Sequence, residues 1–289
     1  MVEPARVVAT GLLLAPDATW LARCAPLFDL VDVFSVTPES TWRGKALAPN
    51  DYAAAFRQIA ARRRRPMVGH GVGFSLASAD ASLRQERWLP ALARDHAAFD
   101  FQWYTEHLGL TVAAGEDLQI PLPVPHTAAN AARVRASLDR LAAVMGTVGV
   151  ENSAWTIHPG QPLDEPAWLA DTLGDRHHLL LDLHNLYASA VNLGFDPEAW
   201  LARAPLHRVI ELHLSGGDDA PATWGAGRRI RLDSHDHDVP NEVWSLFEAV
   251  LPHCPNLRCV TLERQEGTVE AGDTSLLAEC IIRITETVA

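Results

Sequence analysis

The sequence predicts a (β/α)₈ barrel, in which eight parallel strands alternate with helices around a closed sheet. Eight short runs rich in β-branched, leucine or aromatic residues recur along the 289 residues, and helical patterns separate them. No GxGxxG motif follows an early run, and GHGVGFS at 69–75 has the wrong glycine spacing for a doubly wound nucleotide-binding sheet. The alternation therefore favours one barrel domain over residues 1–289 rather than two domains.

Each strand is expected where a hydrophobic run ends in turn residues. The first four runs are RVVATGLLL (6–14), LVDVFSVT (30–37), RPMVGHGV (65–72) and FDFQWYTEHL (99–108). The last four are GTVGVEN (146–152), HHLLLDLHN (177–185), RVIELHLS (208–215) and RCVTLER (258–264). Amphipathic patterns predict helices over 50–63, 84–97, 127–145, 165–174, 240–251 and 272–287. The long intervals 109–126 and 216–239 contain Pro or Gly and are expected to form loops above one face of the barrel.

Composition narrows the class of protein. A hydrophobic content of 48% fits a globular protein with a sizeable core, and a net charge of −12 argues against a nucleic-acid partner. The basic run RRRR at 62–65 lies at a predicted helix end, where arginines favour the helix dipole. The four cysteines form no CxxC pair and are expected to be reduced and mostly buried. Neither a membrane span nor a secretory signal pattern is found, so we expect a cytoplasmic location and no membrane partner.

Polar residues close most of the predicted strands, which raises the question of what neutralises them. In a barrel the carboxyl ends of all strands converge on one mouth, so these groups should lie together. Crowded imidazoles and carboxylates are ordinary ligands for Fe, Mn or Zn, and bound cations would offset their buried charge. The candidates are His70, Glu106, His107, Glu151, Asn152, Asp182, His184, Asn185, His213 and Glu263, joined by Asp233 and His235 from the segment LDSHDHD.

Each of these signals is weak alone. A single histidine at a strand end is more often a hydrogen-bonded structural residue than a metal ligand, and an acidic loop is usually solvated. Asp233 and His235 are two residues apart, so an extended backbone would point both side chains to one side. Repetition at six successive strand units favours a metal site, and the number of candidates exceeds what one ion accepts.

The same segments carry a family resemblance. They are HGVGFSL (70–76), EHLGL (106–110), VENSAW (150–155), LLLDLHNLYASAVNLGFDP (179–197), ELHLSGG (211–217), DSHDHDVPNEVW (233–244) and TLER (261–264). In this order they resemble the xylose-isomerase-like metal barrels, and most closely the multinuclear non-heme iron-dependent oxidases that mature methanobactin, thiaglutamate and bufferin-type precursor peptides. The resemblance runs from about residue 66 to the C-terminus, and LDxxNxYxSAxNxGFDP is its most specific element.

The resemblance implies two or three irons of mixed Fe(II)/Fe(III) state, with O₂ as co-substrate and a precursor peptide, modified at Cys, as substrate. By analogy His70 and His107 hold one ion, Asp182, His213 and Glu263 a second, and Asn185, Asp233 and His235 a third, with Glu151 bridging. Glu106 and His184 are the candidates for catalytic groups that orient ligands or move protons. A small partner protein that binds the leader peptide is expected by the same analogy.

The chain departs from the family pattern around its ligands. Val36 stands where an acid is common, Glu106 replaces an Asp, and His184 replaces a frequent Asn. Gly217 stands where a His often follows, and Gln265 replaces an acid. The nine ligand positions are kept, so we expect an active metal site with a substrate unlike that of the commonest subgroup.

Three alternatives compete with this interpretation. A zinc phosphodiesterase like endonuclease IV shares the ligand order, but the net acidity and Asn185 in place of a His weigh against it. A sugar isomerase usually needs a lysine near its metal, and the sole lysine, Lys45, is far from every matched motif. A degenerate peptide-binding scaffold would not need intact ligand positions.

The loop 216–232 holds candidate groups for substrate binding. Arg228, Arg229 and Arg231 could attract a peptide carboxylate or an acidic leader, and Trp224 could cover the mouth. A solvated basic loop is an equally good interpretation of these residues.

Overall fold

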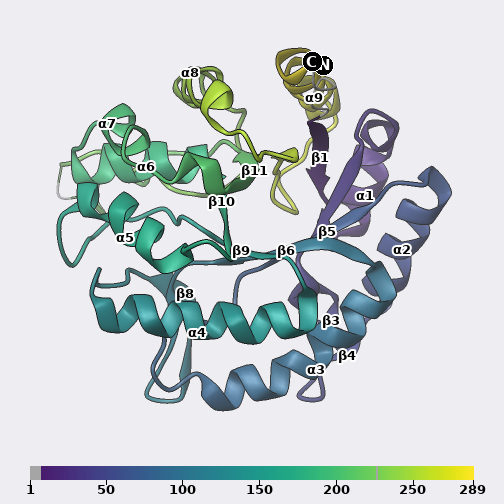
Figure 1. Ribbon diagram of the computed structural model, residues 1–289. Helices are drawn as coiled ribbons and strands as arrows, with labels where there is room; N and C mark the ends of the chain where they lie inside the picture. Colours follow the sequence, from purple (N-terminus) through teal and green to yellow (C-terminus); the bar gives the residue numbers. More distant parts are fainter. Residues whose placement is uncertain (1–7, 226) are drawn as a thin grey trace, which may run out of the picture.

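A computed structural model describes residues 8–225 and 227–289 and contains the predicted barrel. Its eight parallel strands close in the order β1-β12-β11-β10-β9-β6-β5-β2, with helices packed around the outside (Figure 1). The strands are β1 (Ala9–Leu13), β2 (Val33–Val36), β5 (Met67–Gly71), β6 (Phe101–His107), β9 (Val148–Glu151), β10 (His178–Asp182), β11 (Val209–Leu214) and β12 (Cys259–Leu262). The (β/α)₈ fold is confirmed. Positions 6 and 7 of the first predicted strand lie outside the described residues.

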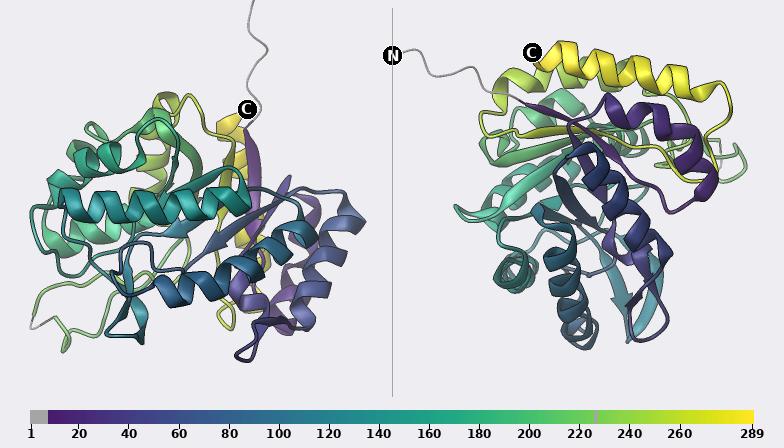
Figure 2. Two further views of the ribbon diagram at one scale, coloured as in Figure 1. Left: turned by 60° about the horizontal axis from the view of Figure 1, so that its bottom comes forward. Right: turned by 90° about the vertical axis from the view of Figure 1, so that its right-hand side faces the viewer.

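All six predicted helices form, and their ends move by no more than about two residues, as is usual for helix ends. They are α2 (Asp51–Arg63), α3 (Ser82–Phe99), α4 (Ala128–Met145), α5 (Glu165–Leu173), α8 (Asn241–Val250) and α9 (Asp273–Val288). Helix α9 lies alongside β1, where the hydroxyls of Thr10 and Thr285 are 2.9 Å apart (Figure 2). The first strand and the last helix therefore meet where the barrel closes.

The predicted strand 177–185 was wrong over its last three residues. Strand β10 ends at Asp182, and α6 (Leu183–Leu193) begins at the next residue. The Asp182 carboxylate accepts a hydrogen bond of 2.6 Å from the backbone N–H of Asn185, so it caps the helix. His184 and Asn185 consequently lie on the first turn of α6 rather than on the strand.

Several short elements escaped the sequence analysis. Helices α1 (Ala18–Cys24) and α7 (Pro197–Leu201) are brief, and the strands β3 (Trp42–Arg43) and β4 (Ala48–Pro49) form a two-stranded ribbon. The interval 109–126 holds the hairpin β7 (Leu110–Ala113) and β8 (Glu116–Leu122), not only loop. Ala114 and Gly115 turn it with positive φ at both positions, the backbone that tight hairpins need.

Alternation along the strands separates an apolar layer from a polar one. On β11, Leu212 and Leu214 belong to the main hydrophobic core, whereas Glu211 and His213 point to the opposite side. The three leucines before Asp182 are completely buried. A strand can thus be hydrophobic towards the helices and still deliver polar groups to the inside of the barrel.

The four cysteines all lie within the described residues and form no disulfide there, and three of them are buried, as expected. Burial raises the pKa of the Cys24 thiol to about 12, which keeps it protonated and unreactive at neutral pH. Among the helices of residues 8–225 and 227–289, none is long and apolar enough to cross a membrane.

Candidate metal centre at the carboxyl ends of the strands

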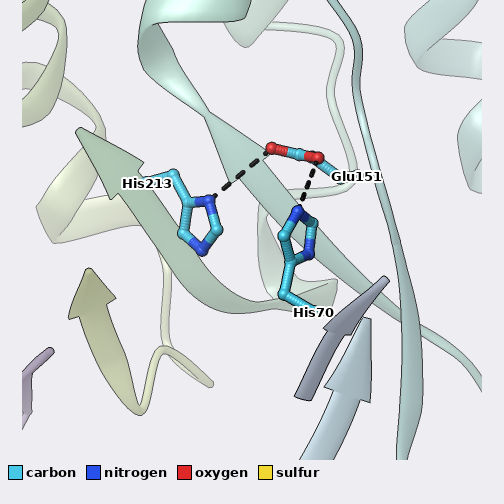
Figure 3. A group of neighbouring side chains, drawn as sticks. All are labelled: His70, Glu151 and His213. Carbon is cyan, nitrogen blue, oxygen red and sulfur yellow. Dashed lines mark ion pairs between the residues drawn. The ribbon is translucent and has the colours of Figure 1, made fainter. Parts of the chain in front are cut away.

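Side chains from three strands point toward one another at the barrel mouth (Figure 3). His70 comes from β5, Glu151 ends β9, and His213 comes from β11. The two oxygens of Glu151 face different imidazoles: Oε2 is 3.3 Å from Nε2 of His70, and Oε1 is 3.6 Å from Nδ1 of His213. One potential ligand atom from each residue lies within 4.8 Å of the other two, a spacing that a metal ion can span.

A second group of three shares His213 with the first. Asp182, His213 and Glu263 also offer ligand atoms within 4.8 Å of one another. Nδ1 of His213 is 3.1 Å from Oε1 of Glu263, which follows directly after β12. The structure therefore brings His70, Asp182 and Glu263 into one connected cluster, although 193 residues separate the first from the last.

The two remaining histidines among the predicted ligands extend this cluster at its edges. Nε2 of His107, at the end of β6, is 2.7 Å from Oε2 of Glu151. Nδ1 of His235 is 3.5 Å from Oε2 of Glu263, and its Nε2 is 2.7 Å from Oδ1 of Asp233. His235 adopts a φ of +51°, so the Asp233–His235 pair lies on a turned segment rather than the expected extended one.

Buried polar atoms without partners indicate that a cation fits the cluster. Oδ2 of Asp182 and Oδ1 of Asn185 are both buried and accept no hydrogen bond from the described part of the chain. The other atoms of these side chains are used, since Asp182 caps α6 and Asn185 donates to the carbonyl of Asn152 at 3.0 Å. An unpaired buried acceptor costs roughly 1–3 kcal/mol, and coordination to a metal would remove that cost. The mixed imidazole, carboxylate and amide donors suit a first-row transition metal.

The electrostatics of the cluster also favour a cation. Burial alone would raise the pKa of Glu151, but His107 and His70 hold it well below its usual value. Burial, followed by the charges of Glu151 and Asp233, raises the pKa of Asp182 well above the ordinary range. Acids crowded in this way compete for the available positive charge, and a divalent ion supplies it.

Hydrogen bonds from outside the cluster orient two of the imidazoles. Nδ1 of His70 lies 2.9 Å from the hydroxyl of Thr105, and Nε2 of His213 lies 3.2 Å from Oε1 of Glu211. Glu211 in turn accepts hydrogen bonds from Thr261 and Trp103. Such contacts fix the ring and aim its other nitrogen at the cluster. The sequence analysis missed Glu211, although its position two residues before His213 on one strand is a usable signal.

Glu106 is completely buried, but the structure does not bring it against the ligands. Its carboxylate accepts hydrogen bonds from the Phe74 backbone N–H at 2.9 Å and the Tyr104 hydroxyl at 2.7 Å. Glu39, which was not singled out in the sequence, accepts from the N–H groups of Val72 and Gly73. Burial and the nearby Glu39 raise the pKa of Glu106 to about 8. The two carboxylates hold the loop that follows His70.

His184 lies against a predicted ligand instead of among the ligands. Nδ1 of His184 is 3.2 Å from Oδ1 of Asp233, and its Nε2 accepts a weak hydrogen bond of 3.4 Å from Arg231. A Cβ atom added to Gly217 would lie 2.9 Å from the His184 ring and 2.2 Å from the carbonyl oxygen of Leu232. The His184 ring therefore lies beside Gly217, at the position where family members often carry a His. These two departures from the family pattern are neighbours in the structure.

A cavity of about 240 Å³ opens onto the cluster. His70, His107, His235 and Glu263 line one part of it, and the segments 13–16 and 264–266 line another. The volume is slightly below the range of about 300–1,000 Å³ usual for small-molecule pockets.

The arginines of loop 216–232 are partly engaged with protein groups. Arg229 and Arg231 both pair with Asp219, at 2.8 and 3.5 Å, and Arg231 also lies 5.7 Å above the ring of Tyr187. Trp224 is 69% exposed. Their roles in binding a substrate stay predictions.

Comparison with known proteins extends the description from fold to family. The structure is similar to a D-allulose 3-epimerase from Methylomonas sp. (TM-score 0.63, 15% identity, 100% and 99% of the two chains covered). It is also similar to endonuclease IV from Thermus thermophilus (TM-score 0.57, 19% identity, 96% and 99%). A xylose isomerase-like TIM barrel protein from Mycobacterium smegmatis, solved with magnesium, gives a TM-score of 0.61 at 15% identity over both whole chains. These likenesses show that the chain shares the TIM-barrel fold of these proteins, which places it in the class of TIM barrels.

Sequence comparison identifies the family within that class. Residues 20–284 match the RiPP precursor modification enzymes MbnB/TglH/ChrH, and the chain belongs to this family. A UPF0276 protein of Caulobacter vibrioides is 36% identical over 194 residues, which are 66% of this chain and 66% of that relative. A UPF0276 protein of Anaeromyxobacter sp. is 30% identical over 266 residues, covering 85% of this chain and 90% of the relative. The resemblance predicted from the sequence motifs is confirmed.

Proposed function

We propose that this protein is an iron- and O₂-dependent oxidase that modifies a residue, most simply Cys, of a ribosomally synthesised precursor peptide. The observation that carries the proposal is the connected cluster in which Glu151 reaches three imidazoles and His213 joins two ligand groups. Family membership supports a peptide substrate. The proposal places the reaction in the cytoplasm and treats residues 1–289 as one catalytic domain.

The chain offers ligands for two or three ions. His70 and His107 would hold one ion, and Asp182, His213 and Glu263 a second. Asn185, Asp233 and His235 would hold the third, and Glu151 would join neighbouring ions through its two oxygens. Iron bound here would supply oxidation of the peptide by O₂. The mixed nitrogen and oxygen donors support iron.

The protein's own groups contribute placement and shielding. Thr105 and Glu211 orient His70 and His213, while His184 holds Asp233. The cavity above the cluster would admit the reacting side chain and limit access of water. Glu106 would act indirectly, by fixing the loop after His70. His184 would orient Asp233 or move a proton.

The competing activities have less support. The only lysine, Lys45, is exposed near the β3–β4 ribbon, away from the position that a metal-dependent isomerase would need. The net charge of −12 disfavours the phosphate backbone of a nuclease substrate. A small leader-binding partner protein is part of the proposal by analogy, and co-purification from the native host tests for it.

The deciding experiment combines metal analysis with a peptide assay. Protein purified without oxygen is expected to contain two or three Fe per chain and, with O₂, to change the mass of a Cys-containing peptide encoded beside its gene. The same peptide with Cys→Ser, and protein loaded with zinc, serve as controls. Zinc alone in the purified protein, together with cleavage of abasic DNA, would refute the oxidase proposal.

A further inference from the structure

Three other residues form a second group with metal-binding potential. His126 precedes α4, His158 follows β9, and Glu165 begins α5. One potential ligand atom from each lies within 4.8 Å of the other two. None of them belongs to the nine predicted ligands, and the sequence analysis did not single them out. Two imidazole nitrogens and a carboxylate oxygen are the ligand set of many zinc sites.

The spacing of the donors fits a single ion. In a tetrahedral site with bonds of about 2.0–2.2 Å, neighbouring ligand atoms lie roughly 3.4 Å apart. Nε2 of His126 is 3.8 Å from Oε1 of Glu165, so a small movement would complete that edge. The rings of His126 and His158 have centroids 4.7 Å apart at 59°, which is close enough for both to reach one ion.

Burial and an unpaired nitrogen supply independent support. The side chains of His126 and Glu165 are each only 8% exposed. Nε2 of His158 is buried and has no hydrogen-bond partner among the described residues. Nδ1 of His158 accepts a hydrogen bond of 3.1 Å from the N–H of Gly160, so the ring proton is on Nε2. Coordination of a metal through Nε2 would move this proton to Nδ1 and break the hydrogen bond with Gly160.

Two tryptophans fix the carboxylate. Oε1 of Glu165 accepts from the indole N–H of Trp155 at 3.1 Å, and Oε2 accepts from that of Trp200 at 3.2 Å. Each oxygen keeps a second lone pair for another partner. The ring of Trp168 stacks on His126 at 5.1 Å and limits its motion. Outer contacts of this kind orient ligands before a metal binds.

We propose that His126, His158 and Glu165 bind one divalent cation of the zinc class, with a fourth position for water or another ligand. The site would tie the segment before α4 to the β9–α5 segment, which starts directly after Glu151. That segment is already linked to α6, because Trp155 receives a hydrogen bond from Asn192 at its carbonyl and contacts the Ser189 hydroxyl through its N–H. The cation is structural and is distinct from the centre at the barrel mouth.

Zinc binding to matched variants tests the site. Holoprotein with its mouth centre loaded is dialysed against micromolar Zn(II), and zinc, iron and melting temperature are measured. His126→Ala/His158→Ala is expected to bind one zinc fewer per chain than wild type and to lose the zinc-dependent rise in melting temperature, with iron unchanged. His96→Ala is the control, since His96 is also half-buried with an unpaired Nδ1 but packs on Phe101. Equal zinc content in wild type and double variant overturns the site.

A single, more conservative substitution keeps the test valid if the double variant fails to fold. Glu165→Gln keeps the shape of the side chain and an acceptor oxygen for one indole, but it removes the negative charge. We expect it to weaken zinc binding by at least about tenfold, in the range found when metal-site groups are altered. Co(II) titration followed by its visible absorption should show a tetrahedral spectrum in wild type that Glu165→Gln loses. Unchanged zinc affinity and an unchanged cobalt spectrum in Glu165→Gln would contradict the proposal, whatever the iron centre does.

Discussion

Glu151 is the residue on which the mouth cluster depends most. Its carboxylate contacts imidazoles from three strands, namely His70 on β5, His107 on β6 and His213 on β11. Because its two oxygens face different histidines, one side chain can serve two neighbouring ions. Removing it would leave His70 and His107 without the carboxylate that they pair with, whereas His213 would keep Glu211 and Glu263.

Glu151→Ala is therefore expected to lose more than half of the bound iron and nearly all peptide oxidation. Iron per chain, measured on anaerobically purified protein, checks this. Glu248→Ala is a suitable control, because Glu248 lies on α8 and forms an exposed ion pair with Arg283, and neither residue belongs to the mouth cluster. Full iron content in Glu151→Ala would count against its bridging role.

His184 contacts one predicted ligand, Asp233, and we expect its role to differ from that of the predicted ligands. It is completely buried and contacts Asp233, and its ring fills space beside Gly217. His184→Asn should keep nearly all the iron but change the turnover of the peptide, because only the support of Asp233 is altered. His177→Asn is a matched control: His177 is also buried and pairs with an aspartate, Asp139, at 2.9 Å, but it precedes β10 at the opposite end of that strand. Iron loss in His184→Asn as large as in Glu151→Ala would mean that His184 is itself a ligand.

At the level of elements, the loop after β5 is held by two carboxylates that the sequence did not assign to it. Glu39 and Glu106 together accept hydrogen bonds from three successive backbone N–H groups, those of residues 72–74. The loop leaves β5 directly after His70 and Gly71, so it sets where the His70 ring stands. An acid, Glu39, is thus present shortly after β2. It lies three residues beyond Val36, the position at which the family commonly has an acid.

Gly71→Ala tests how tightly β5 and β6 are packed at this point. An added Cβ would lie 1.8 Å from the Tyr104 hydroxyl and 2.3 Å from Oε2 of Glu106. Because both groups are buried, the strands would have to shift, at a cost of about 1–3 kcal/mol. We expect a lower melting temperature and a loss of iron, whereas Gly272→Ala should change neither, since no described atom lies within 4 Å of its added Cβ. A Gly71→Ala protein with unaltered melting temperature and iron would show that the loop tolerates the shift.

Strand positions could be predicted from sequence because each barrel strand is a compact hydrophobic run with its own turn signals. The boundary inside LLLDLHNLY could not, because strand and helix are both hydrophobic there and only the Asp182 cap separates them. The candidate site residues at strand ends were predicted from their repetition in the chain, and the structure brings them into one cluster. Thr105, Glu211 and Glu39 were not predicted, because their roles depend on contacts between strands that no local pattern records. The group His126, His158 and Glu165 has no motif at all and is visible only once three separate segments are folded together.

At the scale of the whole molecule, the mouth cluster links the metal to the stability of the barrel. Six of its predicted ligands come from β5, β6, β9, β10, β11 and the position directly after β12, so bound ions would cross-link most of the closed sheet. An unfolded chain cannot gather these side chains, so metal binding should stabilise only the folded state.

Removal of the metal should therefore lower the melting temperature. A ligand present at 100 times its Kd stabilises the folded state by about 2.7 kcal/mol, which corresponds to roughly 4–5 °C in melting temperature for a domain of this size. Calorimetry of iron-loaded protein before and after anaerobic chelation measures the difference, and readdition of Fe(II) should restore it. Glu151→Ala should show a much smaller change, because it starts with little iron. If wild type melts at the same temperature with and without iron, the ions do not cross-link the strands. The ion pairs among the side chains would then stabilise the cluster as well as the metal does.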